Sequence, residues 1–289
     1  MTLRNPVYIK EIRTGNRSYR QVSVFLIFNG ILAVVGLYVL GKMISGMRWN
    51  AAVDYSMVLQ LYTILSILEF GMLQLILTSL AAGCISGERE RRTFDSMMST
   101  SLSSMAIVTG KMAAVLSAVL VLMISSLPVM SLVFIFGGIR YLDLLEMLGG
   151  ILVLSFCTAS AGICFSSWSS RSLVSTILSY SYLFLVTAGP LLLSRLPQIL
   201  GVGIATADSG EKAVDWYHYF LLCNPLFTFY AIVNSQVKGQ NGVLEFMNQW
   251  NGYRSNIITD NWIVVSLVVQ GAIAVVFIWF ALQGIRSKK

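Results

Sequence analysis

Six long apolar stretches divide the sequence and constrain its fold more than any other feature. A membrane-spanning helix needs roughly 20 apolar residues, and each stretch is long enough. They are Gln21–Leu40, Ser56–Ser86, Met112–Gly138, Met147–Trp168, Leu173–Ser194 and Trp262–Gly284. Five contain no Asp, Glu, Lys or Arg, and the second contains only Glu69. We therefore expect an all-α membrane protein with six transmembrane helices.

The composition and the placement of charge agree with this expectation. Charged residues make up 11% of the chain, against about 25% in a soluble domain. The net charge is +7, but the sequence shows no basic groove with stacking aromatics, which argues against nucleic-acid binding. If the amino terminus is cytoplasmic, the inner segments hold 13 of the 20 Lys and Arg residues. This bias predicts a multi-pass protein of the cell membrane with both termini in the cytoplasm.

The sequence offers little that could support catalysis. The only histidine, His218, lies among aromatic residues without a neighbouring nucleophile or acid cluster, and the four cysteines have no metal-binding spacing. A phosphate-binding loop requires G-x-x-x-x-G-K-[ST], which the closest stretch, 201–213, lacks. We therefore expect no enzyme activity, no metal and no cofactor in this chain.

Residues 1–20 form a basic segment before the first apolar stretch. Asn5 and Pro6 suit a helix start, and Tyr8, Ile9 and Ile12 provide an apolar side opposite Lys and Arg residues. Such a helix is typical of the membrane interface. The segment could equally serve only as a topology signal. Beginning the span at residue 21 predicts two parts, an interfacial helix (1–20) and a six-span domain (21–289).

A dense charge cluster separates the second and third apolar stretches. From Glu88 to Asp95, seven of eight residues are charged or carry a hydroxyl, and Phe94, Met97 and Met98 add an apolar side. A loop that docks into a partner's groove would use such a combination, because burial gives affinity and charge gives register. The alternative is a solvated loop that only sets topology.

This stretch, ISGERERRTFDSMMSTSLS, resembles the cytoplasmic coupling segment of ABC-2-type transporter permeases. The opening NPVYIKEIRTGNRS is similar to the family's basic amphipathic start. CNPLFTFYAIV lies where the family has a re-entrant hairpin, within the outer segment 195–261. Two positions depart from the family pattern: Arg92 stands where the family has Gly, and Ser101 where it has Pro.

The resemblance implies a permease subunit of an ATP-driven ABC exporter. It implies a second permease chain, identical or homologous, and separate ATPase subunits that bind ATP and Mg²⁺. The coupling segment would be 86–105. The residues that the resemblance and the docking hypothesis place at the ATPase contact are Glu88, Arg89, Glu90, Phe94, Met97 and Met98. The apolar wall suggests a hydrophobic or amphipathic cargo, such as a peptide, lipid or drug.

Two polar features within the spans are candidates for a transport pathway. Glu69 is the only ionisable residue deep in a span, and a charge there costs about 2.5–3.5 kcal/mol on insertion scales. Ser175, Ser179 and Tyr182 form a polar stripe on the fifth span. A structural glutamate and hydroxyls that join neighbouring helices are the alternative interpretation of both.

Two other functions remain open from the sequence. An ion-coupled secondary transporter could use Glu69 and would need no ATPase, although no internal repeat is evident. A membrane-embedded sensor or immunity subunit could also use a six-span bundle.

Overall fold

The computed structural model describes residues 6–15, 19–50, 55–94, 103–135, 139–200, 216–238 and 261–286. Within these ranges the regular structure is helical. Six helices are long and apolar enough to cross a bilayer, which indicates a multi-pass membrane protein and confirms the six expected spans. They are α2 (Tyr19–Asn50), α3 (Tyr55–Gly83), α6 (Ser104–Ile135), α7 (Tyr141–Trp168), α8 (Ser172–Leu200) and α12 (Trp262–Arg286).

Four shorter helices complete the described chain. They are α1 (Pro6–Gly15), α4 (Ser86–Glu90), the 3-10 helix η2 (Trp216–Cys223) and α9 (Pro225–Lys238). As expected, Pro6 opens α1, where its missing N–H costs nothing. Of the outer segment 195–261, the parts 201–215 and 239–260 lie outside the described residues.

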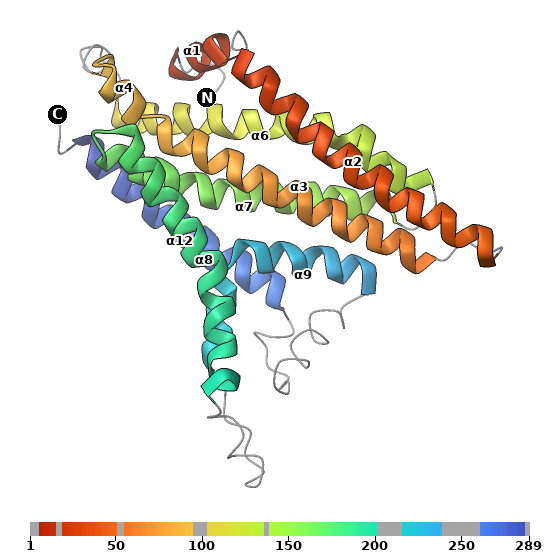
Figure 1. Ribbon diagram of the computed structural model, residues 1–289. Helices are drawn as coiled ribbons and strands as arrows, with labels where there is room; N and C mark the ends of the chain where they lie inside the picture. The colour runs from red at the N-terminus through yellow and green to blue at the C-terminus, as the bar shows by residue number, and fades with distance from the viewer. Residues whose placement is uncertain are drawn as a thin grey trace.

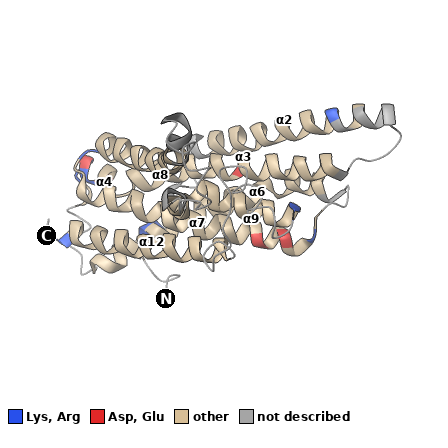
Figure 2. Cartoon of the chain, turned by 90° about the horizontal axis from the view of Figure 1, so that it is seen from below, with Lys and Arg blue, Asp and Glu red and all other residues tan. Residues whose placement is uncertain are grey.

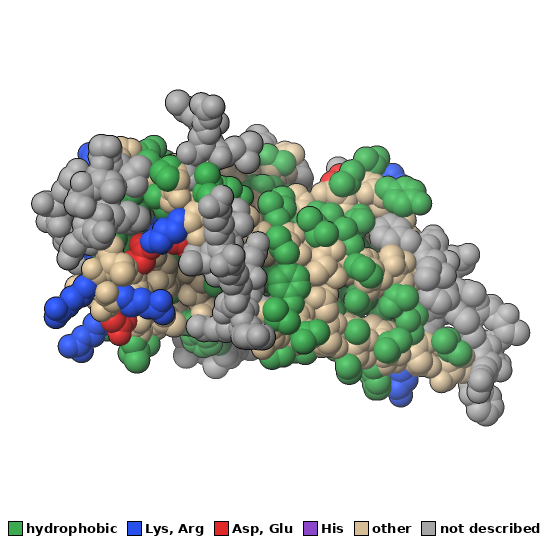
Figure 3. All heavy atoms as spheres, turned by 90° about the horizontal axis from the view of Figure 1, so that it is seen from above, with side chains coloured by type: hydrophobic (Ala, Val, Ile, Leu, Met, Phe, Trp, Pro, Cys, Tyr) green, Lys and Arg blue, Asp and Glu red, His purple; other side chains and the backbone are tan. Residues whose placement is uncertain are grey.

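Helices α2, α3, α6 and α7 lie side by side, and α8 leaves them at a steep angle (Figure 1). Most charged residues lie toward two ends of the bundle (Figure 2). We call one the α4 end, where α1 and α4 lie near both chain termini (Figure 1). We call the other the Asp143 end, after a residue in the first turn of α7. Hydrophobic side chains cover much of the face seen in Figure 3, and basic and acidic side chains gather at one end. This distribution suits a bundle surrounded by lipid.

The centre of the bundle is the pair α3 and α7, which run parallel and touch closely. A Cβ atom placed on Gly162 of α7 would lie 2.6 Å from the Cβ of Ala81 on α3. Near the same end, the backbone N–H of Ile85 donates to Ser166 Oγ at 3.0 Å. Small residues let helix backbones approach where lipid supplies no hydrophobic drive for association.

The helix α9 packs against α3 and α7 and buries most of its length. The ring of Phe229 stacks on Phe70 near the middle of α3, with centroids 4.2 Å apart. Asn224, directly before α9, accepts from the N–H groups of Leu226 and Phe227 at 3.0 and 3.1 Å, which caps the helix. Its amide nitrogen donates to Thr187 O of α8 at 2.9 Å. The start of α9 is therefore capped and anchored to a span.

Polar side chains of α12 provide hydrogen bonds to the polar groups at the break between η2 and α9. Gln270 Nε2 donates to Leu222 O at 3.0 Å and to Thr228 Oγ1 at 2.8 Å, and Ser266 also donates to Leu222 O. All three side chains are buried. Backbone that leaves regular helix inside a membrane protein requires such partners.

Replacing Gly162 with Ala should lower the free energy of unfolding by about 1–3 kcal/mol, because the added methyl must separate α3 from α7. The matched control is Gly149→Ala on the same helix, where no atom lies within 4 Å of the added Cβ. That change should be neutral or stabilising by up to about 1 kcal/mol. Thermal unfolding of the purified protein in detergent measures both, and equal shifts would contradict the close contact.

Candidate functional site

The helix α4 lies beneath the ends of several spans, and its start is held by α7. The N–H groups of Ile85 and Ser86 donate to Ser166 Oγ at 3.0 and 2.9 Å. The first N–H groups of a helix have no partner within the helix, so this hydroxyl supplies one. The side chains of Glu88, Arg89 and Glu90 then contact different helices.

Arg89 binds the carboxyl-terminal ends of two spans. Its guanidinium donates to Ser167 O at the end of α7 and lies 3.4 Å from Gly284 O at the end of α12. It also lies over the ring of Phe94, 4.8 Å from the centroid. The last carbonyls of a helix are unpaired and carry partial negative charge, so a cation is favourable there.

Glu90 binds the amino-terminal end of a third span. Its carboxylate accepts from the backbone N–H of Ser172, the first residue of α8, at 3.0 Å and also from the Ser172 hydroxyl. A carboxylate at this position satisfies a free N–H group and complements the positive end of the helix dipole. Arg89 and Glu90 therefore connect α4 to α7, α12 and α8.

Glu88 joins α4 to α1 and α6 through a cluster of four charges. Its Oε1 lies 3.1 Å from Lys10 Nζ and 3.0 Å from Lys111 Nζ, and Lys111 also pairs with Glu11. The Lys111 side chain is only 2% exposed, whereas that of Lys10 is 54% exposed. The buried ammonium therefore depends on two carboxylates from different elements.

Phe94 does not project from the protein as an exposed docking residue would. Its side chain is 4% exposed and belongs to the main hydrophobic core. Arg91, Arg92 and Thr93 are exposed instead. Met97 and Met98, the other two apolar residues expected at the contact, lie outside the described residues.

Arg92 adopts a backbone conformation that favours glycine. Its φ is 56°, in the left-handed region. Non-glycine side chains pay roughly 1–2 kcal/mol there because Cβ approaches the following carbonyl. The turn after α4 thus requires a strained residue or a glycine.

The pathway candidates lie in different surroundings. Glu69 on α3 is fully buried and accepts a hydrogen bond from Ser126 of α6. Ser175 and Ser179 on α8 are also buried, and the Ser179 hydroxyl donates to Ser175 O at 2.8 Å. Tyr182 packs against Phe277 of α12, with centroids 5.2 Å apart. In the described part of the chain, no hydrogen bond joins Glu69 to the α8 stripe.

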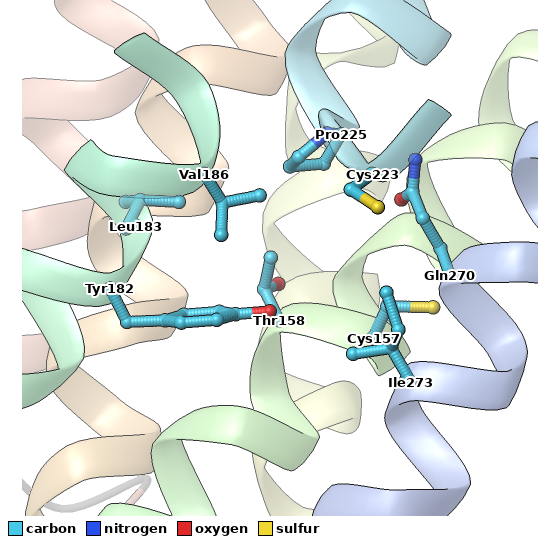
Figure 4. Close-up of a pocket in the computed structure, with 9 residues that line it drawn as sticks. All are labelled: Cys157, Thr158, Tyr182, Leu183, Val186, Cys223, Pro225, Gln270 and Ile273. Carbon is cyan, nitrogen blue, oxygen red and sulfur yellow. The ribbon is translucent and has the colours of Figure 1, made fainter. Parts of the chain in front are cut away.

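Tyr182 instead lines a pocket between α7, α8, α12 and the η2–α9 break (Figure 4). The pocket has an empty volume of about 330 Å³, including the part open to solvent. Its lining residues are Cys157, Thr158, Tyr182, Leu183, Val186, Cys223, Pro225, Gln270 and Ile273. The lining mixes apolar groups with a few polar ones.

Ser266 and Gln270, which support this pocket, were not among the residues predicted from the sequence. The signal was present, since two polar residues spaced four apart share one face of an otherwise apolar span. Their partners, Leu222 and Thr228, could not be identified from spacing because they belong to another segment.

No protein-family model matches the chain, and no curated protein matches it in sequence.

Replacing Lys111 with Met should lower the free energy of unfolding by about 3 kcal/mol, because Glu88 and Glu11 lose their buried counter-charge. Replacing Lys10 with Met should cost less than about 1 kcal/mol, because that ion pair is exposed. Thermal unfolding in detergent distinguishes the two. Equal losses would contradict the difference in burial.

Replacing Arg92 with Gly should raise the free energy of unfolding by about 0.5–1 kcal/mol, because Gly adopts a positive φ without a steric cost. Arg91, with φ of −81°, is the matched control, and Arg91→Gly should lower stability instead. The difference in melting temperature between the two variants is the measurement. A lower melting temperature for Arg92→Gly would refute the assigned turn.

Proposed function

We propose that the chain is the membrane subunit of an ATP-driven exporter of the ABC-2 type. Separate ATPase chains bind below α4, and a second permease chain completes the transporter. The proposal is supported above all by the contacts of α4, which reach α1, α6, α7, α8 and α12 through three consecutive side chains. A force applied to α4 would reach most of the spans at once.

The turn after α4 provides a second, independent support. Arg92 stands where ABC-2 permeases have Gly, and its φ lies in the region that Gly favours. A turn of the same conformation would explain why the family pattern has Gly at this position. The backbone conformation would then be shared at this position although the residue types differ.

The burial of Phe94 moves the proposed ATPase contact to other residues. Glu88 and Arg89 act within the permease by joining its helices, and the ring of Phe94 packs against the Arg89 guanidinium. The exposed residues Arg91, Arg92 and Thr93 form the contact surface. Met97 and Met98, which lie outside the described residues, stay predicted members of the contact. The contact is then basic and suits an acidic groove on the ATPase.

In this function the hydrolysis of ATP by the partner displaces α4 as a rigid element. Because Arg89 and Glu90 bind the ends of α7, α12 and α8, those spans tilt with it. Small rigid movements of helices at an interface are a common way to convert nucleotide binding into alternating access. The cargo is hydrophobic or amphipathic, such as a peptide, a lipid or a drug.

A second candidate is an ion-coupled secondary transporter built around Glu69. The observation in its favour is the full burial of this carboxylate with one hydroxyl donor, Ser126. Ionisable residues at such depth commonly mark ion or substrate pathways. Transport by the purified chain in vesicles without any ATPase would favour this candidate over the exporter.

The test reverses the charge of the proposed contact in the double variant Arg91→Glu, Arg92→Glu. Co-purification with a co-expressed partner ATPase should fall at least about tenfold, because repulsion replaces attraction at the interface. Arg286→Glu, a charge reversal at the end of α12 near the same face, is the control and should leave co-purification unchanged. Undiminished binding by the double variant, with a melting temperature equal to that of the unaltered chain, would overturn the assigned contact.

A further inference from the structure

A chain of polar groups enters the bundle from the Asp143 end. Glu146 is exposed on the second turn of α7. Gln236 of α9 donates through Nε2 to Asp143 O at 2.8 Å and approaches Glu146 Oε2 at 3.4 Å. The Oε1 atom of the same amide accepts from the Tyr62 hydroxyl of α3 at 2.7 Å. One amide thus joins the surface of the bundle to a tyrosine that is 1% exposed.

Below Tyr62, the polar groups continue along one face of α3. Ser66 and Glu69 follow at spacings of four and three residues, so all three side chains lie on the same side of the helix. At 1.5 Å per residue, Glu69 lies about 10 Å deeper than Tyr62. Ser126 of α6 donates to Glu69 Oε1 at the lower end of this face.

Two atoms on this face have no hydrogen-bond partner in the described chain. They are Ser66 Oγ and Glu69 Oε2, and both residues are fully buried. An unpaired buried polar group is destabilising, and more so when it is charged. Consecutive unpaired oxygens on one helix face suit a path that water or a cation enters when it opens.

The charge at the bottom of the path favours cations. At the mouth, the acidic Asp143 and Glu146 lie near two basic groups, Arg140, which pairs with Asp143 at 3.3 Å, and Lys238 at the end of α9. The fully buried Glu69 lies at the bottom. A carboxylate surrounded by low-dielectric walls attracts positive ions.

We propose that Tyr62, Ser66 and Glu69 line a cation-selective access path from the Asp143 end, and that the Tyr62–Gln236 hydrogen bond is its gate. The structure holds the gate closed. This proposal rests on the proposed transport function and adds to it. It assigns the Asp143 end as the side from which Glu69 is reached, and a cation as the species that reaches it. It depends on neither the ATPase nor the identity of the cargo.

The experiment measures the reactivity of a cysteine placed within the path. Cys84, Cys157, Cys164 and Cys223 are first replaced by Ala, and Ser66→Cys is added. The protein is reconstituted in vesicles, and one face at a time is treated with Ag⁺, with the cationic reagent MTSET or with the anionic reagent MTSES. Remaining thiols are counted after denaturation by a mass-adding maleimide. Glu146→Cys and Arg91→Cys, each alone, identify the two faces.

Opening the gate should expose the introduced thiol from one side only. In the Tyr62→Ala and Gln236→Leu backgrounds, we expect Ser66→Cys to react at least about tenfold faster than with the gate intact, and from the face that labels Glu146→Cys. The cationic reagents should react at least about tenfold faster than MTSES, and Glu146→Gln should reduce this preference. Leu68→Cys, at similar depth on another face of α3, should stay unreactive in every background.

Several results would overturn the proposal. They are labelling from the face that labels Arg91→Cys, equal rates for anionic and cationic reagents, and an unreactive Ser66→Cys in both gate variants. If either variant fails to give a monodisperse protein, Tyr62→Phe removes only the hydroxyl and tests the same hydrogen bond. An unchanged rate in that background also rejects the gate. None of these results bears on the contact of α4 with an ATPase, so the two proposals fail separately.

Discussion

The ends of helices converge at the α4 end, and their unpaired backbone groups must find partners there. Arg89 supplies donors to the carboxyl-terminal carbonyls of α7 and α12, and Glu90 supplies an acceptor to the first N–H of α8. In turn, the Ser166 hydroxyl of α7 accepts from the backbone N–H groups at the start of α4. A helix of five residues has little stability of its own, so α4 depends on these contacts as much as the spans do. Charge at this end therefore has a structural role before it has any role in partner binding.

The interior of the bundle follows a different principle. Close approach at Ala81 and Gly162 positions α3 against α7, and several buried polar groups bond to a neighbouring helix. Ser266 and Gln270 satisfy the break before α9, while Gln236 and Tyr62 close the Asp143 end. The helix α9 takes part in both, which makes it a wedge that holds polar surfaces of three spans together.

The six spans could be predicted because length and hydropathy are local properties. The function of Arg89 could not, because its partner Gly284 is 195 residues away and is contacted through a backbone carbonyl that any residue would provide. Phe94 was expected at an exposed contact because its neighbours are charged, yet the ring packs beneath Arg89 and into the core. The hydrogen bond of Gln236 could not be predicted, because its partner Tyr62 lies 174 residues earlier in the chain.

The position of α9 has a consequence for how the protein is made. The ribosome completes five spans before it reaches Pro225, yet the stacking surface of Phe70 and the hydroxyl of Tyr62 find their partners only on α9. During synthesis these groups face lipid or a neighbouring nascent helix. Final consolidation of the second span is therefore postponed until α9 has been translated. An insertion chaperone that shields polar helix faces would act during that interval.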